Sequence, residues 1–266
     1  MNQKLIKIVN LLPELLGTYG DQGNVSTLSW RLSKRGIANE VIHASAYEQL
    51  PNDGDFYLLG GGEDDAQVAA VELLRKQGTL TNALQNGAQI FAVCAGFQLL
   101  GTSFPASGNR TIEGLSLLPV ITEPATPRSV GELLTDSTIT GALTGSLIGS
   151  ATGVEIGKLT GFENHAGQTR FVEKLQPLGT VIRGIGNHVK EASDGAVTDQ
   201  IIATYMHGPA LVRNPKLADY FLSRKLGALE PIGAPIGAPI GEPNSKNSED
   251  RIFTELHDSC VARAAQ

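Results

Sequence analysis

Residues 89–101, with the sequence QIFAVCAGFQLLG, decide how this chain folds. An apolar run rich in β-forming residues ends at Cys94, two small residues follow, and a helical pattern of apolar residues begins at Phe97. This order predicts a nucleophile elbow, in which a strand turns sharply into a helix and raises one side chain above the sheet. Ala95 and Gly96 suit so tight a turn, because larger side chains would block it. Although most cysteines are buried structural residues, the flanking pattern here favours a reactive thiol.

The predicted helix after Cys94 supplies further candidate groups. The positive end of the helix dipole favours the thiolate form of a cysteine at this position. The backbone N–H of Ala95, at the start of the helix, is a natural donor to an oxyanion. Gln98 lies four residues after Cys94, on the same helix face, and could contact whatever the sulfur attacks.

A second oxyanion donor is expected from the three consecutive glycines at 60–62, and we assign it to Gly61. Glycine lets the backbone approach a ligand closely and turn an N–H toward it. A phosphate-binding loop is the competing interpretation of the glycine run. Because no Lys or Ser/Thr follows at the spacing of such loops, that interpretation is weak.

Length and composition exclude several classes of protein. The 266 residues, 41% of them hydrophobic, are enough to bury a substantial core. A formal net charge of −6 argues against a general affinity for nucleic acid or anionic membranes. The two cysteines, Cys94 and Cys260, lie far apart and indicate no disulfide framework. The apolar segment 5–16 is short and interrupted, so we expect no signal peptide, no membrane insertion and a cytoplasmic location.

Strand and helix patterns alternate along the first hundred residues. Such alternation predicts an α/β fold with a mostly parallel central sheet flanked by helices, and a site at the carboxyl ends of its strands. Strands are expected at 5–12, 40–44, 55–59 and 89–93, and helices at 25–35, 64–76 and 81–85. Further strands are expected at 115–122, 154–159, 180–183 and 201–205, loops or short strands at 138–153, and a helix at 215–226.

The C-terminal part of the chain differs in composition. We expect one catalytic domain over residues 1–228 and a Pro/Gly-rich linker over 229–248, which contains the repeat PIGAPIGAPIGE. Residues 249–266 form a tail that could fold as a short helix.

Among the five histidines, His207 is the candidate partner of the cysteine. The predicted strand at 201–206 ends directly at this residue, which would place it at the same sheet edge as Cys94. His165 lies in a polar stretch, 162–169, that we interpret as a loop, and its role is ambiguous. The remaining histidines, His43, His188 and His257, are assigned structural roles.

Taken together, these motifs resemble class I glutamine amidotransferases, which have a flavodoxin-like α/β fold. The elbow VCAGFQ (93–98), the glycine run before it and the late YMHG (205–208) match most closely the branch of cobyric acid synthases. Position 209 is Pro, so the acid that usually lies two residues after the histidine is absent. The third member of a triad is therefore left open, and the resemblance supports a Cys94–His207 dyad.

Two further motifs narrow the resemblance. YGDQGN (19–24), followed by Leu28, Arg31 and Arg35, and GFENHAGQT (161–169) are similar to the glutamine amidotransferase subunits, called GatD, of lipid II isoglutaminyl synthases. The similarity runs from about residue 6 to about residue 226 and leaves out the repeat.

This resemblance implies a subunit that hydrolyses L-glutamine and supplies ammonia. Cys94 would be the nucleophile, His207 the base and then the acid, Arg128 the group that binds the substrate carboxylate, and Gln98 a further substrate contact. A partner resembling a Mur ligase, MurT, would use ATP and Mg²⁺ to amidate the α-carboxyl of D-glutamate in lipid II, giving D-isoglutamine. No cofactor or metal is expected in this chain.

Three alternatives stay open. An amidotransferase of the same branch that serves another acceptor, such as a corrinoid, would share every catalytic residue. A cysteine hydrolase on the same fold, such as a peptidase, would share the elbow. A binding or regulatory subunit could keep the fold without catalysis.

Overall fold

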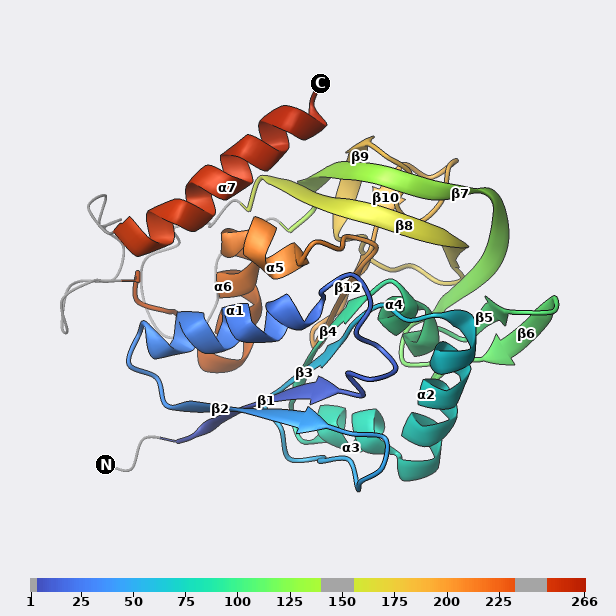
Figure 1. Ribbon diagram of the computed structural model, residues 1–266, viewed down its shortest axis with the longest axis horizontal. Helices are drawn as coiled ribbons and strands as arrows, with labels where there is room; N and C mark the ends of the chain where they lie inside the picture. The colour runs from blue at the N-terminus through green and yellow to red at the C-terminus, as the bar shows by residue number, and fades with distance from the viewer. Residues whose placement is uncertain (1–3, 140–155, 233–247) are drawn as a thin grey trace.

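The computed structural model describes residues 4–139, 156–232 and 248–266, and it contains two sheets (Figure 1). The larger sheet has the strand order β11-β12-β4-β3-β1-β2, and all of its strands are parallel to their neighbours except β11, which runs antiparallel to β12. Its strands are β1 (Ile6–Leu11), β2 (Asn39–Ala44), β3 (Phe56–Leu59), β4 (Gln89–Val93), β11 (Ala196–Val197) and β12 (Ile201–Thr204). The predicted α/β fold with a mostly parallel central sheet is confirmed.

Helices connect and cover these strands. They are α1 (Gln22–Ser33), α2 (Asp64–Gln77), α3 (Thr79–Gln85), α4 (Ala95–Leu100), α5 (Ala210–Arg213) and α6 (Pro215–Leu226). The core is aromatic where α6 meets the sheet, because the ring of Phe221 contacts both Phe56 of β3 and Phe91 of β4. All three side chains are buried, so α6 closes the apolar layer on its side of the parallel sheet.

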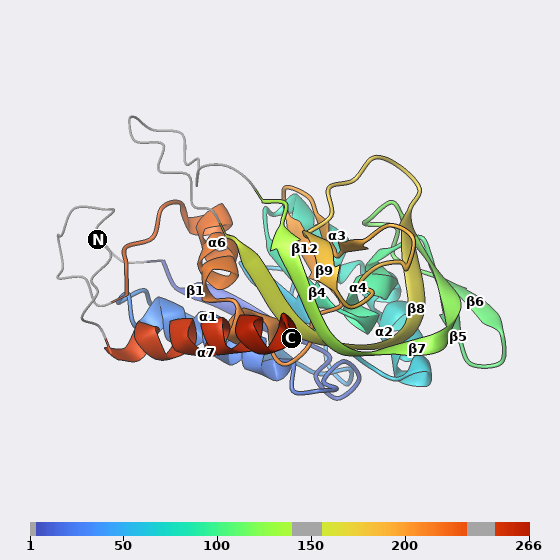
Figure 2. The same cartoon turned by 90° about the horizontal axis from the view of Figure 1, so that it is seen from above.

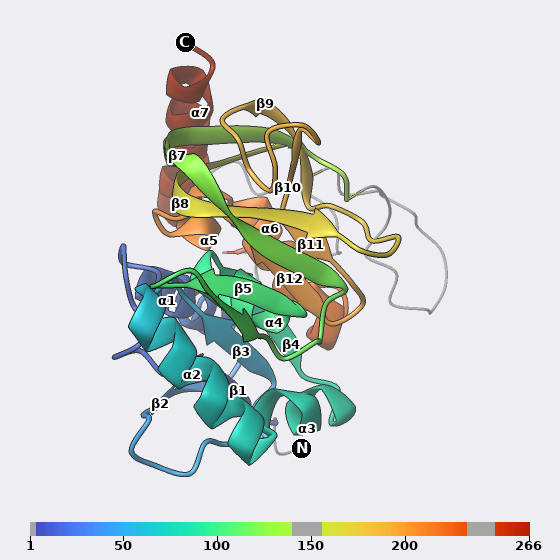
Figure 3. The same ribbon diagram turned by 90° about the vertical axis from the view of Figure 1, so that its right-hand side faces the viewer.

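A second, mainly antiparallel sheet lies beside the first (Figures 2 and 3). Its strand order is β10-β9-β7-β5-β6, with β8 also paired to β7. Its strands are β5 (Ser103–Ala106), β6 (Arg110–Glu113), β7 (Val120–Ser137), β8 (Lys158–Phe171), β9 (Gly179–Arg183) and β10 (Ser193–Asp194). The β7–β8 pairing loses register between Pro124 and Ser129, so the backbone around Arg128 departs from the regular ladder.

The stretch 162–169 was predicted to be a loop, and this prediction was wrong. Its residues lie within β8, where Glu163, His165 and Thr169 are all buried. These polar side chains point inward because they are hydrogen-bonded there, so the usual alternation of apolar and polar residues does not mark the strand. The predicted segment at 138–153 lies largely outside the described residues. Of the strand predicted at 154–159, residues 154 and 155 lie outside them, and residues 158 and 159 begin β8.

The C-terminal tail forms a long helix, α7 (Ser248–Ala264), which packs against α5, α6, β7 and β8 (Figure 1). Most of the expected linker, residues 233–247, lies outside the described residues. Arg31 of α1 joins the helix to the domain: its guanidinium contacts Asp219 of α6 at 2.6 Å and Asp250 of α7 at 3.0 Å. Phe253 of α7 packs against Trp30 beside this ion pair.

Across the three described ranges, none of the helices combines the length and the apolar character needed to cross a membrane.

The buried ion pair predicts a measurable contribution of α7 to stability. Arg31 is 1% exposed, so Arg31→Ala would leave a buried gap, Asp250 without this cation, and Asp219 with only Arg35, which lies 2.9 Å away. We expect the free energy of unfolding to fall by about 3 kcal/mol, measured by urea denaturation. Arg251→Ala on the same helix removes only an exposed pair with Glu255 and should change it by less than about 0.5 kcal/mol. Equal effects of the two substitutions would contradict this role of Arg31.

Candidate active site

The backbone at Cys94 has the strained geometry of a nucleophile elbow. Its φ of 53° and ψ of −106° lie where a residue with a side chain is rarely found, directly between β4 and α4. The Cys94 N–H donates to the carbonyl of Thr204 on the adjacent strand at 2.9 Å, which helps to hold the turn. Gly96 is required for packing, since a Cβ there would lie 2.7 Å from the Leu59 carbonyl oxygen.

His207 is brought to Cys94 by the neighbouring parallel strand. β12 pairs with β4 so that Thr204 lies opposite Val93, and both strands then deliver their next residues to the same edge of the sheet. The backbone of His207 is fixed from the other side by two hydrogen bonds with Phe162 of β8, of 2.9 and 3.0 Å. The predicted proximity of the cysteine and the histidine is thus present in the fold.

A third residue, Asp21, completes the constellation. His207 Nδ1 donates to Asp21 Oδ2 at 2.9 Å, and both side chains are buried. Burial alone would lower the pKa of His207, but the hydrogen bond to Asp21 and the neighbouring Cys94 outweigh it and raise the pKa to about 10. The ring therefore carries a proton at neutral pH and can stabilise a thiolate on Cys94. Nε2, the other ring nitrogen, has no hydrogen-bond partner in the described ranges and remains available for the reaction.

In the glycine run at 60–62, the N–H expected to stabilise an oxyanion is already hydrogen-bonded. The N–H of Gly61 donates to Asp21 Oδ2 at 2.8 Å, so the expected oxyanion donor is occupied by the carboxylate. Gly62, the next residue, lines the same pocket as Cys94 and Ala95. Within the part of the chain that the structure describes, neither the Gly62 nor the Ala95 N–H has a hydrogen-bond partner. These two groups are better placed to receive a negative oxygen.

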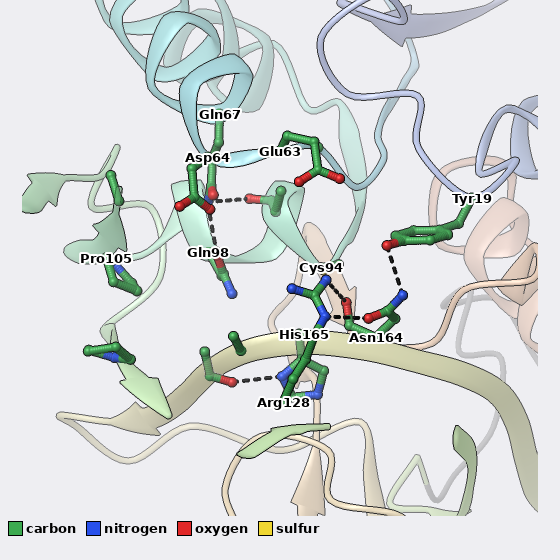
Figure 4. Close-up of a pocket in the computed structure, with 16 residues that line it drawn as sticks. Tyr19, Glu63, Asp64, Gln67, Cys94, Gln98, Pro105, Arg128, Asn164 and His165 are labelled. Carbon is green, nitrogen blue, oxygen red and sulfur yellow. Dashed lines mark hydrogen bonds between the residues drawn. The ribbon is translucent and has the colours of Figure 1, made fainter. Parts of the chain in front are cut away.

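A pocket of about 170 Å³ opens over Cys94 (Figure 4). Arg128 of β7 and Asn164 of β8 lie on one side of it, and Tyr19, from the loop before α1, lies beside them. Glu63 and Asp64, at the start of α2, form the opposite side. The predicted substrate-binding arginine and the predicted nucleophile therefore line one cavity.

Gln98 also lines the pocket, but its amide is held by the protein. Its Oε1 accepts from Gln67 Nε2 at 3.0 Å, and its Nε2 donates to the hydroxyl of Tyr205 at 3.2 Å. The same hydroxyl bonds to Thr169 at 2.6 Å, and the ring of His165 stacks on Tyr205 with centroids 3.9 Å apart. Gln98 is therefore part of the buried polar floor beneath the pocket.

Two carboxylates near the site, those of Glu163 and Asp194, are also buried. Glu163 accepts from the N–H groups of Ile185 and Gly186, each at 2.8 Å. Burial raises the pKa of Asp194 to about 6, although it accepts hydrogen bonds from the Thr204 hydroxyl and the Tyr205 N–H. Both acids fix the backbone that leads to the site, and neither lines the pocket over Cys94.

The remaining histidines lie away from the pocket and make local bonds. His43 bonds to Asn10 at 3.1 Å, His188 to the N–H of Lys190, and His257 of α7 donates to the Arg213 carbonyl. No cluster of three or more His, Cys, Asp or Glu side chains that could hold a metal ion occurs among residues 4–139, 156–232 and 248–266.

Sequence reasoning missed Asp21, Tyr19 and Asn164 as site residues. A signal for Asp21 existed, because an acid that precedes a helix after the first parallel strand must lie at the carboxyl edge, where the site was expected. The expected acid two residues after His207 is replaced by Pro209, so the sequence next to the histidine holds no third member. Tyr19 and Asn164 had no such signal, since their meeting depends on how β8 crosses over the sheet.

Comparison with known proteins identifies the family and agrees with this fold. A family profile described as the CobB/CobQ-like glutamine amidotransferase domain matches residues 7–215. The chain therefore belongs to the CobB/CobQ-like glutamine amidotransferases. A solved structure of a glutamine amidotransferase has a TM-score of 0.51 at 19% identity and covers 82% of this chain and 98% of its own, a likeness that concerns the fold.

Within that family, the chain is similar to two GatD subunits of lipid II isoglutaminyl synthase (glutamine-hydrolyzing). The subunit from Staphylococcus aureus (strain N315) is 30% identical over 221 residues, which cover 82% of this chain and 84% of the relative. The subunit from Streptococcus pneumoniae (strain ATCC BAA-255 / R6) is 32% identical over 216 residues, which cover 80% of this chain and 77% of the relative. The predicted resemblance is confirmed.

Replacing Asp21 by Asn should lower the pKa of His207, because a neutral amide no longer stabilises the imidazolium. We expect a downward shift in the His207 titration followed by NMR, with His43 as an internal control, and a loss of turnover of at least about a hundredfold. In the wild type, the pair of protonated His207 and Asp21 stabilises the folded state fully below pH 6.5, which is the ordinary pKa of histidine. This stabilisation decreases as the pH rises toward 10, the pKa of His207 in the folded state. An unchanged His207 titration in the variant would remove Asp21 from the triad.

Gly61→Ala tests the close approach of the glycine run to the catalytic ring. A Cβ at this position would lie 2.7 Å from His207 Cε1, so the ring must move. Since a shift of about 1 Å can cost about a hundredfold in rate, we expect kcat to fall by at least tenfold. The control is Gly108→Ala, whose positive φ of 74° is strained but whose Cβ meets nothing within 4 Å. Equal kcat values for the two variants would argue against this steric role.

Proposed function

We propose that this chain is the glutamine-hydrolysing subunit of an enzyme that amidates lipid II. The proposal is carried by the strained Cys94, which lies beside His207 and lines the same pocket as Arg128. His207 in turn is hydrogen-bonded to Asp21. The similarity to two GatD subunits, over more than three-quarters of their lengths, supports lipid II amidation as the process served.

In the first half-reaction, the Cys94 thiolate attacks the side-chain carboxamide carbon of glutamine. The N–H groups of Ala95 and Gly62 stabilise the tetrahedral oxyanion as it forms. Protonated His207 then gives its Nε2 proton to the departing nitrogen, so that ammonia leaves and a thioester to Cys94 remains.

In the second half-reaction, water attacks the thioester. Neutral His207 takes a proton from this water, and the Cys94 thiolate is the leaving group, so the products are glutamate and a regenerated ion pair. Asp21 holds the ring in the correct orientation throughout and stabilises its charged form. The balance is glutamine and water to glutamate and ammonia.

The substrate is held by its α-carboxylate. Arg128 presents a guanidinium to the pocket, and this group suits a carboxylate because it offers parallel N–H donors. Gln98, which the sequence indicated as a contact, is bonded to Gln67 and Tyr205, and its part in this proposal is to shape the pocket floor.

The ammonia acceptor belongs to a partner subunit. We propose a Mur-ligase-like protein, MurT, which uses ATP and Mg²⁺ to activate the α-carboxyl of D-glutamate in the lipid II stem peptide and forms D-isoglutamine in the cytoplasm. Cobyric acid synthases are also similar to this chain, so a corrinoid acceptor is the second candidate. Gentle purification of the tagged chain followed by mass spectrometry separates them, since each acceptor requires a different ATP-dependent partner.

The chemical assignment predicts that Cys94→Ala retains less than about a hundredth of the glutaminase rate, measured as glutamate release. Cys260→Ala is the matched control, because Cys260 is the other cysteine and is buried in α7 away from the pocket. His207→Ala should be nearly as damaging as Cys94→Ala. A mild effect of His207→Ala together with complete loss in His165→Ala would overturn the assignment of the base.

A further inference from the structure

The Arg128 side chain can bind a carboxylate at a fixed position only if another residue holds its guanidinium in place. It is exposed, it lies within the irregular segment of β7, and it forms no ion pair with any residue that the structure describes. A free arginine side chain samples many rotamers, and ordering it on substrate binding would cost up to about 2 kcal/mol. A residue that fixes the guanidinium beforehand would remove that cost from substrate binding.

Asn164 provides such a support. Arg128 Nε donates to its side-chain Oδ1, and Arg128 Nη2 donates to its backbone carbonyl at 3.1 Å. Two of the five N–H donors are thereby fixed, while both N–H groups of Nη1 and the second N–H of Nη2 are left for a ligand. Because Asn is neutral, it orients the guanidinium without cancelling the positive charge that a carboxylate ligand requires.

Tyr19 fixes the orientation of the Asn164 amide in turn. Its hydroxyl accepts from Asn164 Nδ2 at 2.8 Å, so the amide oxygen is turned toward Arg128 (Figure 4). The Tyr19 ring lies edge-on to His207, with centroids 4.8 Å apart. Asp21, two residues further on, holds the same histidine. One short loop therefore contacts both the catalytic ring and the support of Arg128.

We propose that Asn164, held by Tyr19, is a positioning residue that presents Arg128 to the α-carboxylate of the substrate at a fixed place relative to Cys94. This inference rests on the proposed function and deepens it, because it names the residues that set the affinity for an α-amino acid amide. Asn164 acts through Arg128 and does not touch the reacting atoms.

The first test is steady-state glutaminase kinetics on full-length variants. Asn164→Ala should raise KM for glutamine about tenfold, and kcat should change less than about threefold, because a hydrogen bond to a charged group is lost but the nucleophile is intact. Tyr19→Phe should raise KM by a smaller factor. Asn164→Asp keeps the size and the acceptor but places a negative charge on Arg128, so its KM should rise at least as much as that of Asn164→Ala. The control is Arg170→Ala. Arg170 lies on β8, the strand of Asn164, its side chain is partly exposed, and its replacement should leave both KM and kcat unchanged.

The second test separates carboxylate recognition from general damage to the site. 6-Diazo-5-oxo-L-norleucine alkylates the nucleophile of such sites and carries the α-carboxylate of glutamine, whereas iodoacetamide alkylates Cys94 and carries none. In Asn164→Ala, the labelling rate by the diazo reagent should fall about tenfold, and the rate by iodoacetamide should not change. Mass spectrometry of the Cys94 peptide gives both rates.

Two results would overturn the inference. In the first, Asn164→Ala keeps the wild-type KM and the wild-type ratio of the two labelling rates. In the second, kcat and iodoacetamide labelling fall while KM is unchanged, which would make Asn164 a support of His207 instead. A wild-type protein that neither hydrolyses glutamine nor reacts with the diazo reagent would overturn the proposed function itself, a result distinct from these two.

Discussion

The strained backbone at Cys94 is the constraint on which the rest of the site depends. A positive φ at a residue with a side chain costs free energy, so the surroundings must hold it in place. Thr204 supplies a hydrogen bond from the adjacent strand, and Gly96 lets α4 approach the end of β3. The same turn exposes the Ala95 N–H and the cysteine sulfur to one pocket. Strain at one residue thus sets the positions of the nucleophile and of an oxyanion donor together.

The elbow and the parallel sheet could be predicted from sequence because both are local features. A strand pattern that ends at Cys94 and another that ends at His207 must meet at one edge if the sheet is parallel, and they do. The glycine run was placed correctly at that edge as well, although its middle N–H is bound to Asp21. Local pattern therefore located the site and two of its central residues.

What could not be predicted depends on long-range packing of polar groups. Asp21 lies 186 positions from His207, and no spacing rule links them. The stretch containing Asn164 was interpreted as a loop, because buried hydrogen bonds replace apolar side chains along β8. Its contact with Tyr19 joins residues 145 positions apart. Polar contacts of this kind follow from the fold and leave no periodic trace in the sequence.

The hydrogen bond between β4 and β12 has a consequence for the newly made chain. Cys94 is synthesised early, whereas Thr204 and His207, which hold its turn and its charge, are more than a hundred residues downstream. Domains fold as the ribosome delivers them, from the N-terminus onward. The thiol therefore remains an ordinary cysteine on the ribosome until β12 joins the sheet. Completion of the parallel sheet and assembly of the Cys94–His207 pair are therefore one step of folding.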